Sequence, residues 1–194
     1  MKQPLRRAAL HEVRIIGGQW KRSKLPVADR PGLRPTPDRV RETLFNWLGQ
    51  DLAGWRCLDA FAGSGALGFE AASRGAAESV LLERDRVLAR SLAQTAERLG
   101  ATAVRVEAAD ALGWMARCPT ARFDLVFIDP PFDAELSEPA LELAVPLLAP
   151  EGFIYLEAGQ PFADDALAPI GLAPHRQARA GAVHFHLLRR VPAA

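Results

Sequence analysis

The sequence contains few of the residues on which disulfide-bonded, metal-binding and membrane proteins depend. Only two cysteines occur among 194 residues, Cys57 and Cys118, and both fall in or near apolar segments. We therefore expect small buried side chains rather than a disulfide or a metal pair, in a reducing cytoplasm. No apolar run approaches the length of a transmembrane helix, and no apolar stretch typical of a secretory signal follows the basic N-terminus. The sequence thus predicts a cytoplasmic protein without a membrane partner.

The sequence also has little net charge, +1 at pH 7, but its charged residues are unevenly distributed. Residues 1–41 contain eleven Lys and Arg and three Asp and Glu, a net charge of +8, whereas residues 42–194 carry −7. A basic segment on an acidic body is typical of a protein that contacts an anionic polymer. A solvated tail is the alternative, but Ile15, Ile16 and Trp20 indicate that part of the basic segment is ordered.

The residues after position 55 alternate between short apolar runs and amphipathic segments. Repeated βα units of this kind predict an α/β domain with a mostly parallel sheet and helices on both faces. The predicted strands are 56–60, 79–83, 103–107, 123–128 and 152–157, followed by an antiparallel pair at 172–180 and 182–190. The predicted helices are 65–74, 86–99, 111–117 and 136–148.

Two further elements are predicted in the basic segment and just after it. Residues 12–27 indicate a β-hairpin that turns at Gly17 and Gly18. A helix is expected to begin at residues 36–38, with the Thr36 hydroxyl as a candidate N-cap, and to end at Gly49. We therefore divide the chain into a basic N-terminal extension, residues 1–36, and a main domain, residues 37–194.

A glycine-rich segment, residues 59–68, joins the first strand of the predicted sheet to its helix. Gly63, Gly65 and Gly68 fit the GxGxxG pattern, in which the backbone approaches a ligand and the helix N-terminus points at it. Many βα turns are glycine-rich only for close packing, so the pattern alone is weak evidence.

Three acidic residues follow three neighbouring strands beside this glycine loop. Asp59 would repel a pyrophosphate but suits a ligand with a cationic amine, such as the methionyl part of S-adenosylmethionine. Glu83 stands where an acid commonly binds ribose hydroxyls, and Asp110 could accept a hydrogen bond from an adenine amino group. Each acid alone is typical of a solvated or capping residue. The three together favour an adenosine ligand with a cationic amine.

The residues that follow the 123–128 strand form a rigid turn with free hydrogen-bond acceptors. Pro130 and Pro131 fix φ and remove two backbone donors, while Asp129 and the proline carbonyls can accept hydrogen bonds. Phe132 adds a flat apolar face. Because ligands bind at the carboxyl ends of strands in open α/β sheets, this turn indicates a site for a planar amine such as a nucleobase.

These motifs together resemble the class I S-adenosylmethionine-dependent methyltransferases. With the N-terminal residues included, they resemble the bacterial RsmD family of 16S ribosomal RNA guanine-N2 methyltransferases; the similar segments are 14–20, 24–26, 32–36, 38–48, 59–68 and 129–132. The resemblance implies a Rossmann-like, seven-stranded, mostly parallel sheet with an antiparallel last strand and a small N-terminal β extension that contacts RNA. It implies S-adenosyl-L-methionine as cofactor and 16S rRNA, within a small-subunit particle, as partner. The implied reaction is methylation of the exocyclic N2 of one guanine.

The motifs and the resemblance assign roles to particular residues. Asp129 and the Pro130 carbonyl would accept the two amine hydrogens and orient the nitrogen. Arg34 and Thr36, just before the first predicted helix, could close over the site. The predicted catalytic residues are Asp129, Pro130, Pro131 and Phe132. The predicted cofactor-binding residues are Asp59, Phe61, Ala62, Gly63, Ser64, Gly65, Glu83 and Asp110. The predicted RNA-binding residues are Arg14, Trp20, Lys21, Arg22, Lys24 and Arg34; no metal ligand is expected.

Three other functions fit part of the sequence. A DNA or other RNA amino-methyltransferase, acting on adenine N6 or cytosine N4, would use the same turn at 129–132, although the chain is short for a DNA target-recognition region. An NAD-dependent oxidoreductase would explain GxGxxG but neither Asp59 nor the turn. A non-catalytic RNA-binding module explains only the basic segment. No oligomerisation signal is evident, so we expect a monomer.

Overall fold

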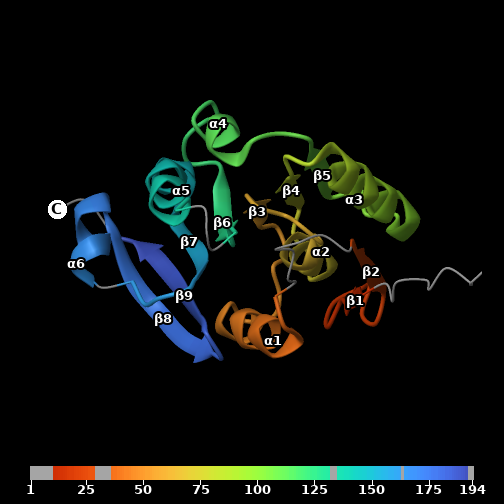
Figure 1. Ribbon diagram of the computed structural model, residues 1–194, viewed down its shortest axis with the longest axis horizontal. Helices are drawn as coiled ribbons and strands as arrows, with labels where there is room; N and C mark the ends of the chain where they lie inside the picture. Colours follow the sequence, from red (N-terminus) through yellow and green to blue (C-terminus); the bar gives the residue numbers. More distant parts are fainter. Residues whose placement is uncertain (1–10, 29–35, 132–134, 163, 192–194) are drawn as a thin grey trace, which may run out of the picture.

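The computed structural model describes residues 11–28, 36–131, 135–162 and 164–191, and its centre is a seven-stranded sheet (Figure 1). The strand order is β5-β4-β3-β6-β7-β9-β8, and neighbours among the first five strands are parallel. β9 is antiparallel to both β7 and β8, so the predicted antiparallel last strand is confirmed. The strands are β3 (Arg56–Asp59), β4 (Glu78–Leu82), β5 (Val104–Glu107), β6 (Phe123–Ile128), β7 (Leu148–Ala158), β8 (Leu172–Ala180) and β9 (Val183–Arg190).

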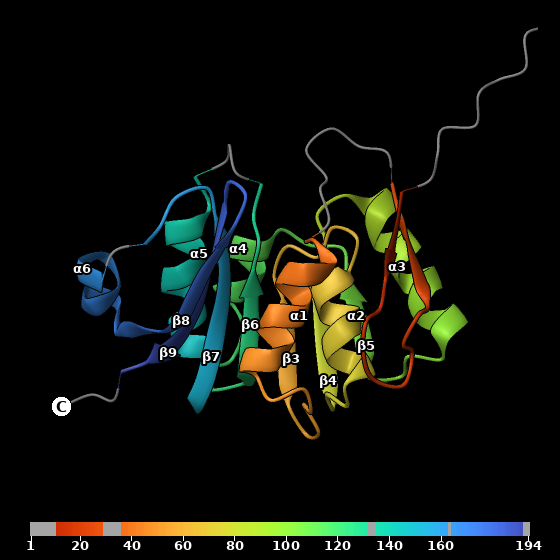
Figure 2. The same ribbon diagram turned by 90° about the horizontal axis from the view of Figure 1, so that it is seen from below.

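Helices cover both faces of the sheet, as Figure 2 shows. On one face lie α1 (Asp38–Trp47), α2 (Ala66–Ser73) and α3 (Arg86–Leu99). On the other lie α4 (Ala111–Met115), α5 (Ser137–Ala144) and the short α6 (Asp164–Leu167), with 3-10 turns η1 (Val145–Leu147) and η2 (Ala168–Ile170) after the last two. Alternate residues of the central strands therefore pack against different helices.

Local sequence signals account for several element boundaries. The Asp85 carboxylate accepts hydrogen bonds from the backbone N–H groups of Val87 and Leu88 and so caps α3. Gly100 ends α3 in the left-handed region at φ 61°, where glycine has no steric penalty. Pro146 ends α5 in a 3-10 turn, as its missing N–H predicts.

A separate two-stranded sheet, β1 (His11–Arg14) with β2 (Lys24–Val27), lies over α2 and α3 (Figure 1). The predicted hairpin is confirmed, but its loop is longer than a turn at Gly17 and Gly18. Arg14 pairs with Lys24, so residues 15–23 form the loop. Within the loop, Ile15 exchanges backbone hydrogen bonds with Arg22 and Ser23, while the tip of the loop donates backbone N–H groups to Glu70 and Ser73 of α2.

The start of α1 differs from the predicted N-cap. Pro37 occupies the N-cap position with φ −58° and ψ 148°, and no side chain caps the helix. The Thr36 hydroxyl instead donates to Asp129 Oδ2, 3.3 Å away. The prediction of Thr36 as a helix cap was therefore wrong, because a partner 93 residues further along the chain takes its hydrogen bond.

The structure bears on the two cysteines and on the absence of long apolar segments. Both cysteines are free thiols; Cys57 is buried, as expected, whereas Cys118 is only half-buried. Among the residues that the structure describes, no helix is long and apolar enough to cross a membrane.

Candidate active site

The predicted site residues come together at one edge of the sheet, where parallel strands β3, β4 and β6 end. Asp59 is the last residue of β3, while Glu83 and Asp129 directly follow β4 and β6. Parallel strands present their carboxyl ends at the same edge, which is why residues distant in sequence converge. The side chains of Cys57 and Phe127, two residues before Asp59 and Asp129, belong to the core under α1. By strand alternation, both carboxyl groups lie on the α1 side of the sheet.

The loop after β3 needs glycine for steric reasons. Gly63 and Gly65 have φ values of 52° and 77°, in the left-handed region that other residues rarely adopt. A Cβ on Gly65 would lie 2.7 Å from side-chain atoms of Leu92 and Phe69, and one on Gly68 would lie 2.6 Å from Leu81. Gly65 and Gly68 therefore serve close packing, while Gly63 gives the loop its path.

Asp59 is turned inward beneath this loop. It is 2% exposed, and its Oδ2 accepts a hydrogen bond from the Gly68 N–H at 2.9 Å. Burial raises the pKa of Asp59 to about 7; the hydrogen bond from Gly68 opposes this shift and the nearby Glu83 adds to it. The carboxyl group is thus poised to change charge near neutral pH.

Glu83 connects the glycine loop to the next strand end. Its Oε2 accepts from the Gly63 N–H at 3.0 Å, and its Oε1 accepts from the Asp85 N–H at 2.8 Å. A half-buried carboxylate held beside the loop is suited to accept hydrogen bonds from vicinal hydroxyls.

The other predicted cofactor residues differ in their setting. Asp110 is exposed and caps α4 by accepting from the Gly113 N–H at 2.8 Å, whereas its contact with the cofactor stays a prediction. Ala62 and Ser64 are buried in the loop, and Phe61 packs against the core on the opposite face of the sheet.

The rigid turn after β6 presents Asp129 beside the N-terminal end of α1. Asp129 is half-buried, and desolvation raises the pKa of its carboxyl well above the usual value; Glu157 and Asp59 add to the shift and Thr36 opposes it. Pro130 is buried and Pro131 is exposed. Phe132, the fourth predicted catalytic residue, lies outside the described residues.

Two buried polar residues behind Asp129 were not predicted. Glu157, in β7, is 3% exposed, and Tyr155 is fully buried. The Tyr155 hydroxyl donates to Glu157 Oε1 at 2.8 Å. The sequence did contain a signal for Glu157, which is its place at the end of a strand. Glu157 lies near the end of β7, much as Asp129 directly follows β6.

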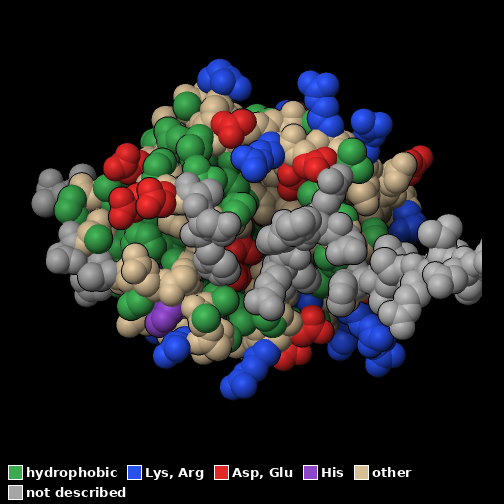
Figure 3. All heavy atoms as spheres, viewed as in Figure 1, with side chains coloured by type: hydrophobic (Ala, Val, Ile, Leu, Met, Phe, Trp, Pro, Cys, Tyr) green, Lys and Arg blue, Asp and Glu red, His purple; other side chains and the backbone are tan. Residues whose placement is uncertain are grey.

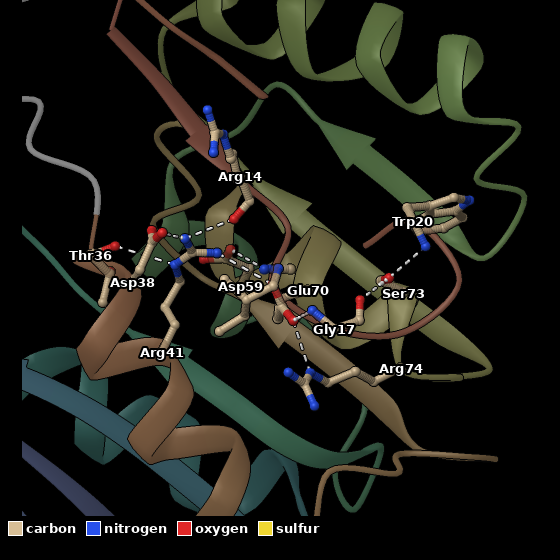
Figure 4. Close-up of polar contacts among 12 residues, drawn as sticks. Arg14, Gly17, Trp20, Thr36, Asp38, Arg41, Asp59, Glu70, Ser73 and Arg74 are labelled. Atoms are coloured by element: carbon tan, nitrogen blue, oxygen red, sulfur yellow. Dashed lines mark hydrogen bonds and ion pairs between the residues drawn. The ribbon is translucent and has the colours of Figure 1, made fainter. Parts of the chain in front are cut away.

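A buried ion-pair network attaches the N-terminal sheet to this site (Figure 4). The Arg41 side chain is fully buried; its Nη1 lies 3.3 Å from Glu70 Oε2, and its Nη2 donates to the Arg14 carbonyl at 2.9 Å. Glu70, in α2, accepts from the backbone N–H groups of Ile16 and Gly17, each at 2.8 Å. Arg41 also bonds Asp38 and the Thr36 carbonyl. One network therefore joins the hairpin, α1 and α2.

The same network has a second layer on α2. Arg74 Nε lies 2.9 Å from Glu70 Oε1, and the guanidinium stacks over the Phe45 ring at 4.7 Å. The Ser73 hydroxyl donates to the Gly17 carbonyl at 2.6 Å and accepts from the Trp20 N–H at 3.0 Å. The hairpin loop is thus held on α2 through backbone atoms of Ile16, Gly17, Gln19 and Trp20.

The side chains of the predicted RNA-binding residues in the hairpin differ in how exposed and how free of other partners they are. The side chains of Arg14, Lys21 and Arg22 are exposed, whereas Lys24 forms an exposed ion pair with Glu12 at 2.7 Å. Trp20 is half-buried against the core of the N-terminal sheet. Arg34 lies outside the described residues. Figure 3 shows Lys and Arg side chains near the β1–β2 sheet and acidic side chains near the middle of the same face.

The strand order, the antiparallel β9 and the glycine loop after β3 define the class of protein, a Rossmann-like methyltransferase fold. Residues 13–189 match the model of a family described as conserved hypothetical protein 95. The chain is 44% identical over 196 residues to ribosomal RNA small subunit methyltransferase D of Escherichia coli strain K12. That match covers 98% of this chain and 96% of the Escherichia coli protein. The chain therefore belongs to this family, as its resemblance to RsmD proteins predicted.

Two further comparisons agree in sequence and in structure. Over 153 residues the chain is 45% identical to the protein of the same name from Haemophilus influenzae, with 75% of this chain and 78% of that protein covered. The solved structure of the yhhF protein from Escherichia coli superposes with a TM-score of 0.81 at 44% identity. That match covers 93% of this chain and 99% of the other.

Proposed function

We propose that the protein transfers a methyl group from S-adenosyl-L-methionine to the exocyclic N2 of one guanine in 16S ribosomal RNA of the small subunit. The observation that carries the proposal is the Asp129-Pro130-Pro131 turn at a strand end beside the glycine loop. The name of the relatives, ribosomal RNA small subunit methyltransferase D, supports rRNA methylation as the activity. The choice of guanine N2 rests on the family resemblance.

The residues around the glycine loop fit the cofactor. Gly63 gives the loop its path beside the ligand, Glu83 would bind the ribose hydroxyls, and Asp59 would attract the cationic amine through the loop. Asp110, next along this edge, would accept from the adenine amino group. When bound, S-adenosylmethionine supplies an electrophilic methyl group.

The rest of the chemistry falls to the turn after β6. The lone pair of an aryl amine is delocalised into the ring, so the nitrogen must be oriented before it can react. Asp129 and the Pro130 carbonyl would accept its two hydrogens, which favours pyramidal geometry and aims the lone pair. Phe132 would stack on the base, which must leave any helical stack to enter the site. Arg14, Lys21 and Arg22 would contact phosphates without reading sequence.

The test is to incubate purified protein with S-adenosylmethionine labelled in the methyl group and, separately, naked 16S rRNA, small-subunit particles and duplex DNA. We expect label in rRNA, as one substrate form or both, and none in DNA. Label in DNA but not in rRNA would contradict the proposal. Tight binding of NAD without binding of S-adenosylmethionine would favour an oxidoreductase instead.

A further inference from the structure

The β8–β9 hairpin is basic, although residues 42–194 as a whole carry a charge of −7. Residues 172–194 contain four arginines and three histidines but no aspartate or glutamate. All twenty acids of residues 42–194 therefore precede the hairpin. The four arginines are exposed, and they are Arg176, Arg179, Arg189 and Arg190. The end of the chain is thus a second basic segment, in addition to the N-terminal one.

The charges of these arginines are not neutralised within the protein. Among the residues that the structure describes, none of the four forms an ion pair with an acid. The Arg179 Nε donates to the Gly181 carbonyl at 2.7 Å, and the Arg176 Nη1 donates to the His175 carbonyl at 3.4 Å. A guanidinium group has five N–H donors, so both side chains keep donors for an anion. Acids do pair with other arginines, namely Arg41, Arg56, Arg74, Arg105 and Arg122.

The positive charges of the hairpin also lie close together. Desolvation lowers the pKa of His175, and the charges of Arg176 and Arg189 lower it further, so both guanidinium groups lie near this ring. Like charges repel one another, and a bound polyanion removes that repulsion. Charges on an outermost strand such as β8 can also prevent pairing with a second copy of the sheet. Charges of either sign would do so, and the single sign found here therefore favours an anionic partner.

The hairpin reaches the edge of the sheet at which the candidate active site lies. Arg179 pairs with His184, which pairs with Ala158 at the end of β7. Asp129 directly follows β6, which is parallel to β7. β8 is three strand spacings from β6, about 14 Å. Arg179 is thus near the site without being part of it, and Arg176 lies three residues back along the same outermost strand.

The N-terminal sheet lies on the other side of Asp129. It packs over α2 and α3, beside β3, β4 and β5, whereas β8 is the last strand in the opposite direction. Figure 3 shows Lys or Arg side chains near both the β1–β2 sheet and the β8–β9 hairpin, with acidic side chains between them. The active-site edge therefore has an acidic centre between two basic surfaces.

We propose that Arg176 and Arg179 contact phosphates of the RNA strand that carries the target base, on the side of the site opposite to the N-terminal sheet. This inference rests on the proposed function. A stacked strand advances about 3.4 Å per nucleotide, so a distance of about 14 Å corresponds to roughly four nucleotides from the target base. Guanidinium groups suit phosphate oxygens because they can donate two parallel hydrogen bonds. The two basic surfaces hold the RNA on either side of a centre whose own carboxyl groups do not attract phosphate.

The test compares wild type with the double variant Arg176→Gln and Arg179→Gln in binding to naked 16S rRNA and, separately, to small-subunit particles. Affinity is measured at several salt concentrations. Each lost phosphate contact should lower the slope of log affinity against log salt by about 0.7–0.9. Between about 50 and 200 mM salt, wild type should therefore lose about 7- to 12-fold more affinity than the double variant. Arg176→Lys with Arg179→Lys keeps both charges and should retain the wild-type slope.

Arg190→Gln is the matched control, because it removes the same charge from the same hairpin. Arg190 is exposed but pairs with Leu172, at the end of the hairpin far from the site, and its replacement should leave the slope unchanged. An effect of Arg190→Gln equal to that of Arg179→Gln alone would overturn the proposal, since net charge would then explain binding. An unchanged slope in the double variant would also overturn it. Self-association of that variant in sedimentation, with unchanged RNA binding, would instead assign the arginines to protection of the sheet edge.

Binding and methylation are measured separately, so this inference and the proposed function can fail independently. If the wild-type protein binds rRNA but methylates none, the proposed function fails, while the salt dependence still tests the arginine contacts. If rRNA is methylated and the double variant keeps the wild-type slope, only this inference fails. Absence of RNA binding by wild type would overturn both. An unfolding temperature equal to that of wild type shows that each variant is folded.

Discussion

Replacing Arg41 by methionine tests whether the buried ion-pair network holds the N-terminal sheet against α1 and α2. Methionine keeps much of the aliphatic packing but removes the charge and the donors to the Arg14 and Thr36 carbonyls. Removing one partner of a buried ion pair typically costs about 3–5 kcal/mol. Glu70 retains Arg74 and two backbone N–H donors, so we expect the low end, about 3 kcal/mol. For a domain of this size that corresponds to a fall in Tm of about 6–12 °C.

The assay is thermal and urea unfolding followed by circular dichroism, with Arg39→Met as the matched control. Arg39 is an exposed residue of the same helix, and its replacement should change stability by less than about 0.5 kcal/mol. Glu70→Gln, alone and with Arg41→Met, completes a double-mutant cycle whose coupling energy should exceed about 1 kcal/mol. A loss below about 1 kcal/mol for Arg41→Met, or additive effects in the cycle, would refute the reasoning.

Three other predictions follow from the site and the hairpin. Asp59→Asn should gain stability relative to wild type as pH rises from 4 to 8, by at most about 4 kcal/mol, because the raised pKa of about 7 makes ionisation of Asp59 unfavourable in the folded protein. Urea unfolding of both proteins at pH 4 and pH 8 checks this. A stability difference between them that is the same at both pH values would contradict it. Gly65→Ala should cost about 1–3 kcal/mol and weaken S-adenosylmethionine binding in calorimetry, because φ is 77° and two side chains occupy the Cβ position; wild-type affinity would be the contrary result. Lys21→Glu with Arg22→Glu should lower the salt dependence of RNA binding by about one unit of slope for each lost cation without affecting cofactor binding; an unchanged slope would remove these residues from the RNA interface.

Much of the fold follows from local signals in the sequence. α3 has the predicted bounds, 86–99, and β6 has the predicted bounds because an apolar run ends just before a proline pair. The convergence of Asp59, Glu83 and Asp129 was also predictable, since parallel strands end at a common edge.

The network behind the site was not predicted, because its contacts join segments distant in the sequence. Arg41 lies three, four and seven residues before Leu44, Phe45 and Leu48, and this spacing places it on the core face of α1. The periodicity was therefore available, but only the partner, Glu70 on α2, makes a charge acceptable there. Two roles were open for Thr36, a helix cap and a residue near the site, because its bond to Asp129 has no local signature that would decide between them.

The central claim is that the turn after β6 holds a guanine amine for methylation. The most direct measurement is nucleoside mass spectrometry of 16S rRNA, naked and in small-subunit particles, after incubation with the protein and labelled S-adenosylmethionine. Wild-type protein should yield labelled N2-methylguanosine at a single position, and Asp129→Ala should reduce it by about 100-fold or more. Label on another base or atom, or full activity of Asp129→Ala, would contradict the account.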